Sequence, residues 1–255
     1  MAAAYGALGG HGHTIGSAWG DLDNDGHIDL IVGNFAHPGQ PEPKFLRNLG
    51  PEGNWHFEDK SAEAGLAFVE SFASPALGDF DNDGDLDLFL TAIYNPDACV
   101  LYRNNGDWTF TNITNDAGLA TVHDRPHNAQ GNWADFDNDG DLDLVADGKL
   151  FRNPGNSNFW VKIKLVGTAV NRAAIGEQAR ISIGNQTYTR QVEGATGETN
   201  QNDLALHFGL GTQTDPVAVT ITWPGWHTTD RYHSQQCDDD HQADPPGQSV
   251  IFIRR

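Results

Sequence analysis

Short apolar stretches alternate with Asp- and Gly-rich turns through residues 1–157 of this 255-residue chain. A stretch at residues 16–19 leads into one such turn, and an apolar stretch at residues 28–32 follows it. A third stretch is centred on an Arg-Asn pair and a fourth on Phe57. Four strands in roughly 40–50 residues make one blade of a β-propeller. The pattern therefore predicts propeller blades in this part of the chain.

From about residue 158 onward apolar and polar residues alternate, which is typical of strands with one buried face. The alternation covers residues 161–165, 179–183, 204–208 and 217–223, and a last strand is expected at 249–253. We predict an all-β protein with two domains, namely propeller blades over residues 1–157 and a small β-sandwich-like domain over residues 158–255. The polar segment 228–246 is expected to be an irregular surface loop.

Three nearly identical loops repeat within the predicted blades, starting at Asp21, Asp79 and Asp135. Each reads Asp-x-Asp-Asn-Asp-Gly and has another Asp at its ninth position, and an Arg-Asn pair follows each loop. The first two units also share a Trp-x-Phe segment and an Ala-Gly-Leu ending, which the third unit lacks. Tryptophans recur with the blades (Trp19, Trp55, Trp108 and Trp133), and most of them are expected in the core.

The spacing of the aspartates predicts a calcium site in each loop. Carboxylates at positions 1, 3 and 5 of a tight turn gather on one concave side, and Gly at position 6 permits the positive φ that the turn needs. Hard oxygen ligands of this number select Ca²⁺, since Mg²⁺ demands tighter octahedral geometry. The predicted ligands are Asp21, Asp23, Asp25, His27 and Asp29; Asp79, Asp81, Asp83, Asp85 and Asp87; and Asp135, Asp137, Asp139, Asp141 and Asp143. His27, Asp85 and Asp141 are expected to contribute backbone carbonyls, and about three ions are expected per chain.

Two alternatives concern what these loops are. An EF-hand needs Glu at position 12 and flanking helices, whereas Val32, Leu90 and Ala146 stand there in strand-like stretches. A solvated turn without an ion is common for one copy, but three copies with a fixed ninth-position Asp argue against it. A further reading is that the calcium only holds the fold.

The charge balance excludes some partners. The chain has 35 Asp and Glu against 15 Lys and Arg, so its formal net charge is −20. Nucleic acid and anionic membranes need a positive surface and are not expected as partners. No apolar run is long enough to span a membrane. The first ten residues lack the features of a signal peptide, so we expect a cytoplasmic chain or a mature or partial piece of a longer one. Cys99 and Cys237 can pair or both be free.

The loops with their Arg-Asn and Ala-Gly-Leu companions resemble FG-GAP/VCBS repeats, the blades of integrin-α-like β-propellers. The second domain is similar to the ASPIC/UnbV domain of the cartilage acidic protein family and of many bacterial secreted proteins. The residues that carry this likeness are Asn-Arg-Ala-Ala-Ile-Gly at 171–176, Leu-His-Phe-Gly-Leu-Gly at 206–211 and Trp-Pro-Gly at 223–225.

The resemblance implies an extracellular or periplasmic protein whose propeller, usually of about seven blades, is stabilised by calcium on the loop aspartates. This chain shows three recognisable units, and four is the usual minimum for closure. We expect either a partial propeller whose other blades are missing from the chain or assembly of open propellers from several chains.

The leading hypothesis is a non-enzymatic, calcium-binding adhesion or recognition module with an extracellular protein or glycan as ligand. The alternative is an enzyme, a lyase or hydrolase acting on a polysaccharide or other extracellular substrate. Its candidate catalytic residues are His13 and His127, which precede the first and third loops by eight residues and can bind a metal or move protons at the propeller mouth. His207 is expected to be a hydrogen-bonded structural residue, and a metal site at Cys237 and His241 is a further alternative.

Overall fold

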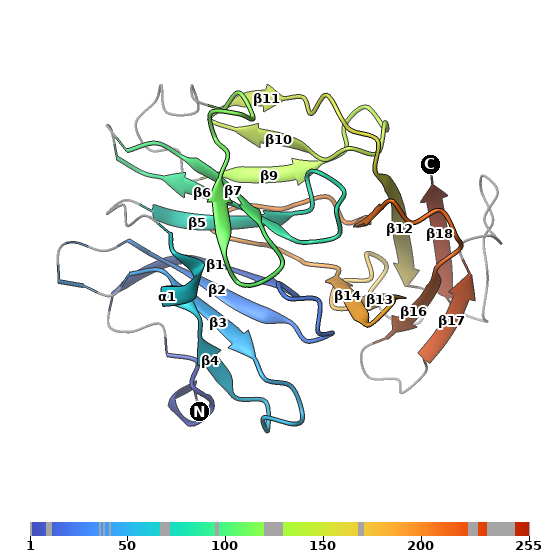
Figure 1. The fold of residues 1–255 in the computed structure, drawn as a ribbon, viewed down its shortest axis with the longest axis horizontal. Coiled ribbons are helices and arrows are strands. Elements are labelled where there is room, and N and C mark those ends of the chain that lie inside the picture. The colour runs from blue at the N-terminus through green and yellow to red at the C-terminus, as the bar shows by residue number, and fades with distance from the viewer. Residues whose placement is uncertain are drawn as a thin grey trace.

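The computed structural model describes residues 2–8, 12–35, 37, 39–40, 42–66, 72–94, 97–119, 130–167, 171–223, 229–233 and 248–254. In these ranges the regular secondary structure consists of β-strands, apart from one 3-10 turn (Ala2–Tyr5) and the one-turn helix α1 (Ser61–Ala64). The described strands form five separate sheets, as the all-β prediction requires. Figure 1 shows the blades on one side of the molecule and the C-terminal strands on the other.

Three blades precede the C-terminal domain, and in each the strands follow one another in chain order. Blade 1 contains β1 (His13–Gly20), β2 (Asp29–Phe35), β3 (Lys44–Asn48) and β4 (Phe57–Asp59); blade 2 contains β5 (Phe72–Gly78), β6 (Asp87–Ala92), β7 (Val100–Asn104) and β8 (Phe110–Asn112); blade 3 contains β9 (Gly131–Ala134), β10 (Asp143–Ala146) and β11 (Lys149–Phe151). Each Asp loop joins the first and second strands of its blade. In all three blades the residue before the loop pairs with the ninth-position Asp, for example Gly20 with Asp29.

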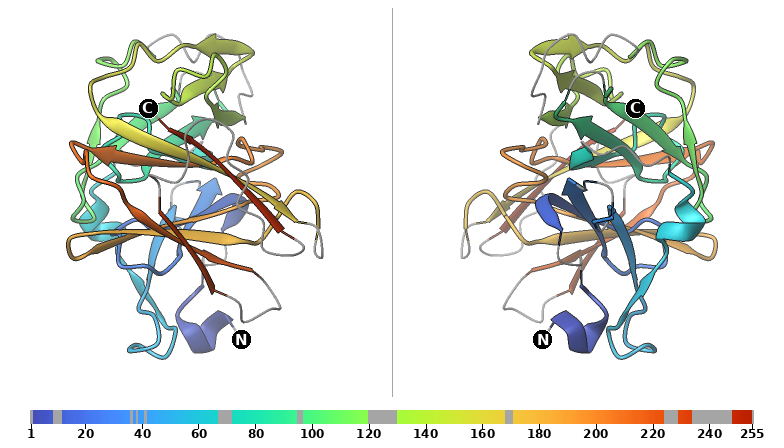
Figure 2. Two further views of the ribbon diagram at one scale, coloured as in Figure 1. Left: turned by 90° about the vertical axis from the view of Figure 1, so that its right-hand side faces the viewer. Right: turned by 90° about the vertical axis from the view of Figure 1, so that its left-hand side faces the viewer.

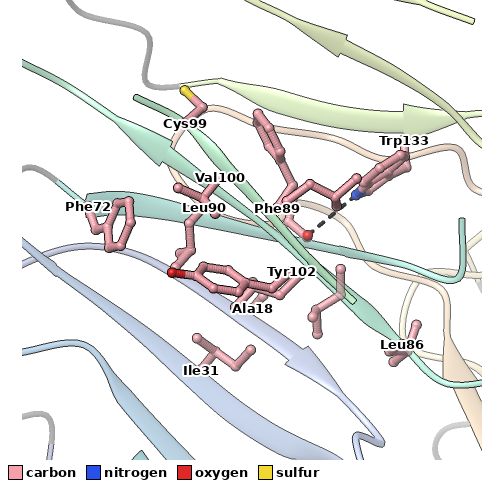
Figure 3. Packing of buried hydrophobic residues seen from close by; sticks show 14 of the residues in the cluster. Ala18, Ile31, Phe72, Leu86, Phe89, Leu90, Cys99, Val100, Tyr102 and Trp133 are labelled. Atoms are coloured by element: carbon pink, nitrogen blue, oxygen red, sulfur yellow. Dashed lines mark hydrogen bonds between the residues drawn. The ribbon is translucent and has the colours of Figure 1, made fainter. Parts of the chain in front are cut away.

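One hydrophobic core joins the three blades. Figure 3 shows Ala18 and Ile31 of blade 1, Phe89 of blade 2 and Trp133 of blade 3 in this cluster. The ring of Trp133 stands edge-on to Phe89, and its Nε1 donates to the carbonyl oxygen of Ala76 at 3.4 Å. Three strands of blades 1 and 2, namely β2, β5 and β6, are buried along their whole length. The blades are therefore held together largely by side chains of their inner strands.

The C-terminal domain consists of two sheets around a second core. Its strands are β12 (Phe159–Gly167), β13 (Gln178–Ile183), β14 (Gln186–Gln191), β15 (Leu206–Gly211), β16 (Ala218–Thr222), β17 (Thr229–His233) and β18 (Gln248–Arg254). The sheet orders are β15-β12-β18 and β14-β13-β16-β17. Ile163 of β12 and Ile181 of β13 lie in one buried cluster with Trp223. Because both sheets contribute to this cluster, the domain is a β-sandwich.

The structure corrects the predicted strands in three places. Residues 229–233, expected in an irregular loop, form β17, which pairs with β16 in the register Ala218↔His233. It is an edge strand held by backbone hydrogen bonds, so it needs no apolar alternation. β14 was not predicted, because its sequence Gln-Thr-Tyr-Thr-Arg-Gln is mostly polar. β15 begins at Leu206, two residues later than expected.

The four tryptophans of the blades divide into two buried and two exposed residues, contrary to the expectation that most are in the core. Trp108 and Trp133 are buried, whereas Trp19 and Trp55 of blade 1 are exposed. Trp55 and Trp108 occupy equivalent places in their blades, with exposed fractions of 53% and 7%. Trp108 contacts the blade before it, through a bond to Asp23. Among the described residues no blade precedes blade 1, so Trp55 has no carboxylate of a preceding blade to bond.

Candidate metal centres

The three loops, which we number 1 (residues 21–29), 2 (79–87) and 3 (135–143), share one backbone conformation. Asn at position 4 has a positive φ in each loop, at 54° in Asn24, 57° in Asn82 and 61° in Asn138. Gly at position 6 has a φ of 89–102°, a region open to Gly at low energy. Asn is among the few other residues that tolerate the left-handed region. The Asp-Asn-Asp-Gly sequence therefore sets this fold locally.

Carboxylate hydrogen bonds close each loop. In each loop the position 9 aspartate accepts two hydrogen bonds from backbone N–H groups. One donor is position 2 of the loop, and the other is the Asn of the Arg-Asn pair that follows the loop. In loop 1 these bonds run to Asp29 from Leu22 at 2.9 Å and from Asn48 at 2.7 Å. Position 1 accepts from positions 5 and 6 in loops 1 and 3. The N–H groups thus hold the acidic side chains toward one centre.

The carboxylates of positions 1, 3 and 9 converge in every loop. One oxygen of each lies within 4.8 Å of the others, in the groups Asp21, Asp23 and Asp29; Asp79, Asp81 and Asp87; and Asp135, Asp137 and Asp143. Nine of the fifteen predicted ligands are therefore brought together, three in each loop. Oxygen atoms at this separation suit a hard cation such as Ca²⁺.

The position 5 and position 7 residues lie outside these groups and make other contacts. Asp25 and Asp139 pair with Arg47 (3.1 Å) and Arg152 (2.8 Å), and Asp83 accepts from the backbone N–H of Asp85. The ring of His27 stands edge-on to Trp55, while Asp85 and Asp141 accept hydrogen bonds from Asn24 and Asn82. Their part as ligands stays a prediction.

Burial disfavours the ionised form of the grouped carboxylates in loops 1 and 2. It raises the pKa of Asp21 to about 7 and that of Asp29 to about 8. It likewise raises the pKa of Asp79 to about 7, although the Arg190 charge opposes the shift. Desolvation is the main cause in each case. A bound cation would restore the ionised form of these groups.

Several oxygens in these groups are buried and have no hydrogen-bond partner, namely Asp23 Oδ1, Asp79 Oδ1 and Asp81 Oδ1. A buried polar atom left without a partner costs about 1–3 kcal/mol. These oxygens are suited to a cation rather than to a hydrogen-bond donor of the protein, because their neighbours in the group are also acceptors. The residues present therefore fit a calcium ion in loops 1 and 2.

The Asn of each Arg-Asn pair ties neighbouring blades together, a role that sequence reasoning missed. Asn104 Nδ2 donates to Leu86 O in its own loop and to Leu22 O in loop 1. Asn153 Nδ2 bonds Leu142 O and Phe80 O in the same way. The repetition of Arg-Asn after each loop was the available signal. It did not show that the amide bridges two blades.

The C-terminal domain covers all three loops, which sequence reasoning also missed. Thr189 N donates to Asp21 Oδ2 at 3.0 Å, Gly209 N to Asp79 Oδ2 at 2.8 Å and Lys162 Nζ to Asp135 Oδ2 at 2.9 Å. These donors belong to β14, β15 and β12. In the left view of Figure 2 the C-terminal strands lie across the blades. Each position 1 aspartate thus faces its own loop on one side and the second domain on the other.

The second domain packs closely against the loop glycines. Gly26 lies against Thr187, Gly84 against Tyr188 and Gly140 against Trp160. A Cβ atom added at Gly140 would lie 1.6 Å from Trp160 Cε2. Glycine at position 6 therefore serves the backbone turn and the fit of the second domain together.

The histidines of the enzyme hypothesis lie away from the loops or outside the described residues. His13 is an exposed residue at the start of β1, whose eight residues separate it from loop 1 by roughly 23 Å. Its ring lies near those of Phe35 and His37. His127 falls outside the described ranges, as do Cys237 and His241, so the pairing of Cys99 with Cys237 also stays untested. A catalytic role for His13 and His127 stays a prediction.

His207 is a structural residue, as expected. Its Nε2 lies 2.6 Å from Asn82 Oδ1 at the domain junction, and its ring stacks on Trp160. Burial, with the nearby charges of Arg190 and Lys162, lowers its pKa to about 3. The ring is therefore neutral at physiological pH.

Two family models match this chain. The model described as FG-GAP-like repeat matches residues 21–90 and 79–146, and the one described as ASPIC and UnbV matches residues 167–248. This chain is an FG-GAP-repeat protein with an ASPIC and UnbV domain. The first matches contain the three Asp loops of the blades. The second covers most of the sandwich that caps those loops.

Curated relatives of this FG-GAP-repeat chain carry one name. Cartilage acidic protein 1 of Mus musculus is 27% identical over 244 residues, which cover 88% of this chain and 35% of the relative. The Homo sapiens protein of that name is 26% identical with the same coverage, and the Xenopus tropicalis protein is 25% identical over 233 residues, covering 83% of this chain and 34% of the relative. The chain thus spans about a third of the length of these relatives.

Among its described residues, no helix has the length and apolar character needed to cross a membrane.

Proposed function

We propose that this chain is a calcium-binding module of a secreted-type protein that acts in adhesion or recognition without catalysing a reaction. Calcium in the Asp loops stabilises the blades and also holds the ASPIC and UnbV domain on them. The observation that carries the proposal is the set of buried carboxylate oxygens without a partner, each converging with two other aspartates. FG-GAP-like repeats over the same residues support it.

The role of the ion follows from where the loops lie. Asp21 and Asp79 each accept a backbone N–H of the second domain through Oδ2, while the loop gathers around the same carboxylate. Without an ion, these buried carboxyl groups either become protonated or stay ionised and repel one another. Both outcomes weaken the junction. An ion on the loop side leaves the carboxylate charged and strengthens the bond on the domain side.

An extracellular location agrees with the name of the curated relatives, which are called cartilage acidic proteins. Extracellular calcium is plentiful, so sites with dissociation constants of about 10⁻⁴–10⁻³ M suffice there. The formal net charge of −20 adds to the demand for cations. A ligand for such a module would be an extracellular protein or a glycan. It would bind away from the loop face, since the second domain covers that face.

Blades 1 and 3 have edges that suit a further blade of the same kind. Trp19 and Trp55 are exposed on blade 1. Phe136 at position 2 of loop 3 is 51% exposed, whereas Leu22 at that position in loop 1 is 1% exposed beneath blade 2. We therefore propose that additional repeats cover both edges. Addition of a flanking repeat should move the fluorescence of the exposed Trp19 and Trp55 to shorter wavelength, and unchanged emission would contradict this.

Calcium removal tests the proposed function. The desalted protein should contain calcium by elemental analysis, and excess chelator should lower its melting temperature. A site held at a hundredfold excess of calcium over its dissociation constant contributes about 2.7 kcal/mol, which corresponds to roughly 5–10 °C for a chain of this size. Restoration by Ca²⁺ but not by equal Mg²⁺ would identify the ion. The proposal is wrong if the melting curve is the same in chelator and in millimolar Ca²⁺.

The same elemental analysis addresses the enzyme alternative. About one zinc, iron or manganese ion per chain, lost in His13→Ala or His127→Ala with the fold intact, would favour a catalytic histidine site. Calcium alone would favour the binding module.

A further inference from the structure

Lys162 is a buried cation placed against loop 3. It stands on β12 and is only 5% exposed, and its Nζ donates to Asp135 Oδ2 at 2.9 Å. Trp160, two residues earlier and hence on the same face of the strand, lies against Gly140 of that loop. Val161 and Ile163 point the other way, into the sandwich core. Two neighbouring side chains on one face of β12 therefore contact loop 3.

The donor at this place differs in charge among the three loops. Oδ2 of the position 1 aspartate accepts a neutral backbone N–H from Thr189 in loop 1 and from Gly209 in loop 2. In loop 3 the same oxygen accepts from the ammonium group of Lys162. The second domain thus places a full positive charge in hydrogen-bond contact with the position 1 aspartate of loop 3 only, and a peptide dipole in that contact in loops 1 and 2.

Arg190 is another cation of the second domain near the loops, and its hydrogen bonds run elsewhere. Its Nη2 lies 3.6 Å from Asp79 Oδ2, beyond hydrogen-bond distance, and donates to Gly84 O at 2.9 Å. Its Nε donates to His207 O, and its guanidinium lies over the ring of Phe208. Its positive charge acts on Asp21 of loop 1 and on Asp79 of loop 2. Arg190 therefore donates no hydrogen bond to a position 1 aspartate, whereas Lys162 does.

Loop 3 is also the loop whose buried oxygens are satisfied. Both oxygens of Asp135 and both of Asp143 accept hydrogen bonds. Asp137 and Asp139 pair with Arg152 at 2.6 and 2.8 Å. In loops 1 and 2, by contrast, Asp23 and Asp79 each keep a buried oxygen without a partner. Arg47 pairs with Asp23 and Asp25 of loop 1 in the same way as Arg152 pairs in loop 3. Loop 3 has Lys162 in addition, so that two cations contact three of its five carboxylates.

We infer that Lys162 is a resident counter-ion that makes loop 3 the weakest of the three calcium sites, an inference that rests on the proposed function. The ammonium repels an ion that would share Asp135 with it, and this repulsion is strong because both are buried. Calcium affinity follows the net charge of the ligand set. Two ions bind first, in loops 1 and 2, and the third binds at a calcium concentration at least about tenfold higher.

The test measures calcium binding to the full chain by isothermal titration calorimetry and equilibrium dialysis. Wild-type protein should bind two ions tightly and a third at least about tenfold more weakly. Lys162→Met keeps the apolar stem and removes the charge, so the third ion should tighten by about tenfold or more. Lys164→Met is the matched control, because Lys164 lies on the same strand but is exposed. It should leave all three steps unchanged.

A second pair of variants covers the case in which Lys162→Met does not fold. Asp135→Asn should leave the two tight ions in place and remove the weak one, whereas Asp21→Asn should remove a tight one. Three wild-type sites of equal affinity, or loss of a tight ion in Asp135→Asn, would overturn the inference and leave calcium binding intact. No calcium bound to wild-type protein at millimolar concentration would overturn the proposed function as well.

Discussion

The indole Nε1 of Trp108 donates a hydrogen bond of 3.1 Å to Oδ2 of Asp23, across the boundary between blade 2 and blade 1. Asp23 is one of the grouped carboxylates of loop 1 and also pairs with Arg47 at 2.6 Å. A core residue of one blade therefore orients a candidate metal ligand of the blade before it.

This relationship predicts different consequences for two equivalent tryptophans. Trp108→Phe should lower the free energy of unfolding by about 2–3 kcal/mol, because a hydrogen bond to a charged group is lost and the site is buried. Trp55→Phe should change it by less than about 0.5 kcal/mol, since Trp55 is exposed. Urea denaturation in millimolar calcium measures both. Equal losses for the two variants would show that the inter-blade bond contributes nothing.

The buried carboxylates predict a pH dependence for the calcium-free chain. Burial raises the pKa of Asp21 to about 7 and that of Asp29 to about 8, from the ordinary aspartate value of 3.8. Between pH 4 and 8 the folded state therefore binds more protons than the unfolded state, so stability falls as pH rises. Each group contributes at most about 1.4 kcal/mol per pH unit over its window.

Melting temperatures in excess chelator should thus decline from pH 5 to pH 8. The same scan in millimolar calcium should be flatter, because the ion holds these groups ionised in the folded state. A melting temperature that rises with pH in chelator would contradict the assigned direction.

The amide bridge between blades predicts unequal effects of two equivalent asparagines. Asn104 is buried and its Nδ2 bonds carbonyl oxygens in both loop 1 and loop 2. Asn48 bonds one carbonyl, that of Ile28 in its own loop. Asn104→Ala should destabilise the chain by about 2–4 kcal/mol, since two buried carbonyls lose a donor. Asn48→Ala should cost about half as much, and chemical denaturation of the two variants compares them.

The fit of Gly140 against Trp160 predicts a lesion at the junction of the domains. Gly140→Ala places a Cβ atom inside the indole ring of Trp160 and strains a φ of 89°. Gly148→Ala is the control, because its φ of 66° is also positive but no atom lies within 4 Å of the added Cβ.

Gly148→Ala should cost about 1 kcal/mol through backbone strain, whereas Gly140→Ala should cost at least about 2 kcal/mol more. Limited proteolysis should then cut Gly140→Ala between the domains, near residue 158, at protease concentrations that leave the control intact. Identical digestion of the two variants would show that this contact does not hold the domains together.

The sequence by itself determined the repeated loops, the blade strands and most strands of the sandwich. A nine-residue turn is governed by short-range preferences, such as the positive φ of Asn24 and Gly26 and the bond that Asp29 accepts from the N–H of Leu22 within the same loop. Alternation marked β12 and β16 for the same reason, because the side-chain period of a strand is local. It missed β14 and β17, whose residues are mostly polar or lie at a sheet edge.

Only the tertiary structure decided what each loop faces. Trp55 and Trp108 have equivalent sequence surroundings, and their burial differs because one has a neighbouring blade and the other does not. Lys162 reads as one more polar residue in an alternating strand, yet it is a buried partner of Asp135. The donors of Thr189 and Gly209 are backbone N–H groups, which every residue except proline carries. Such pairings depend on which surfaces meet across 27 to 168 residues of chain, and no local pattern encodes that.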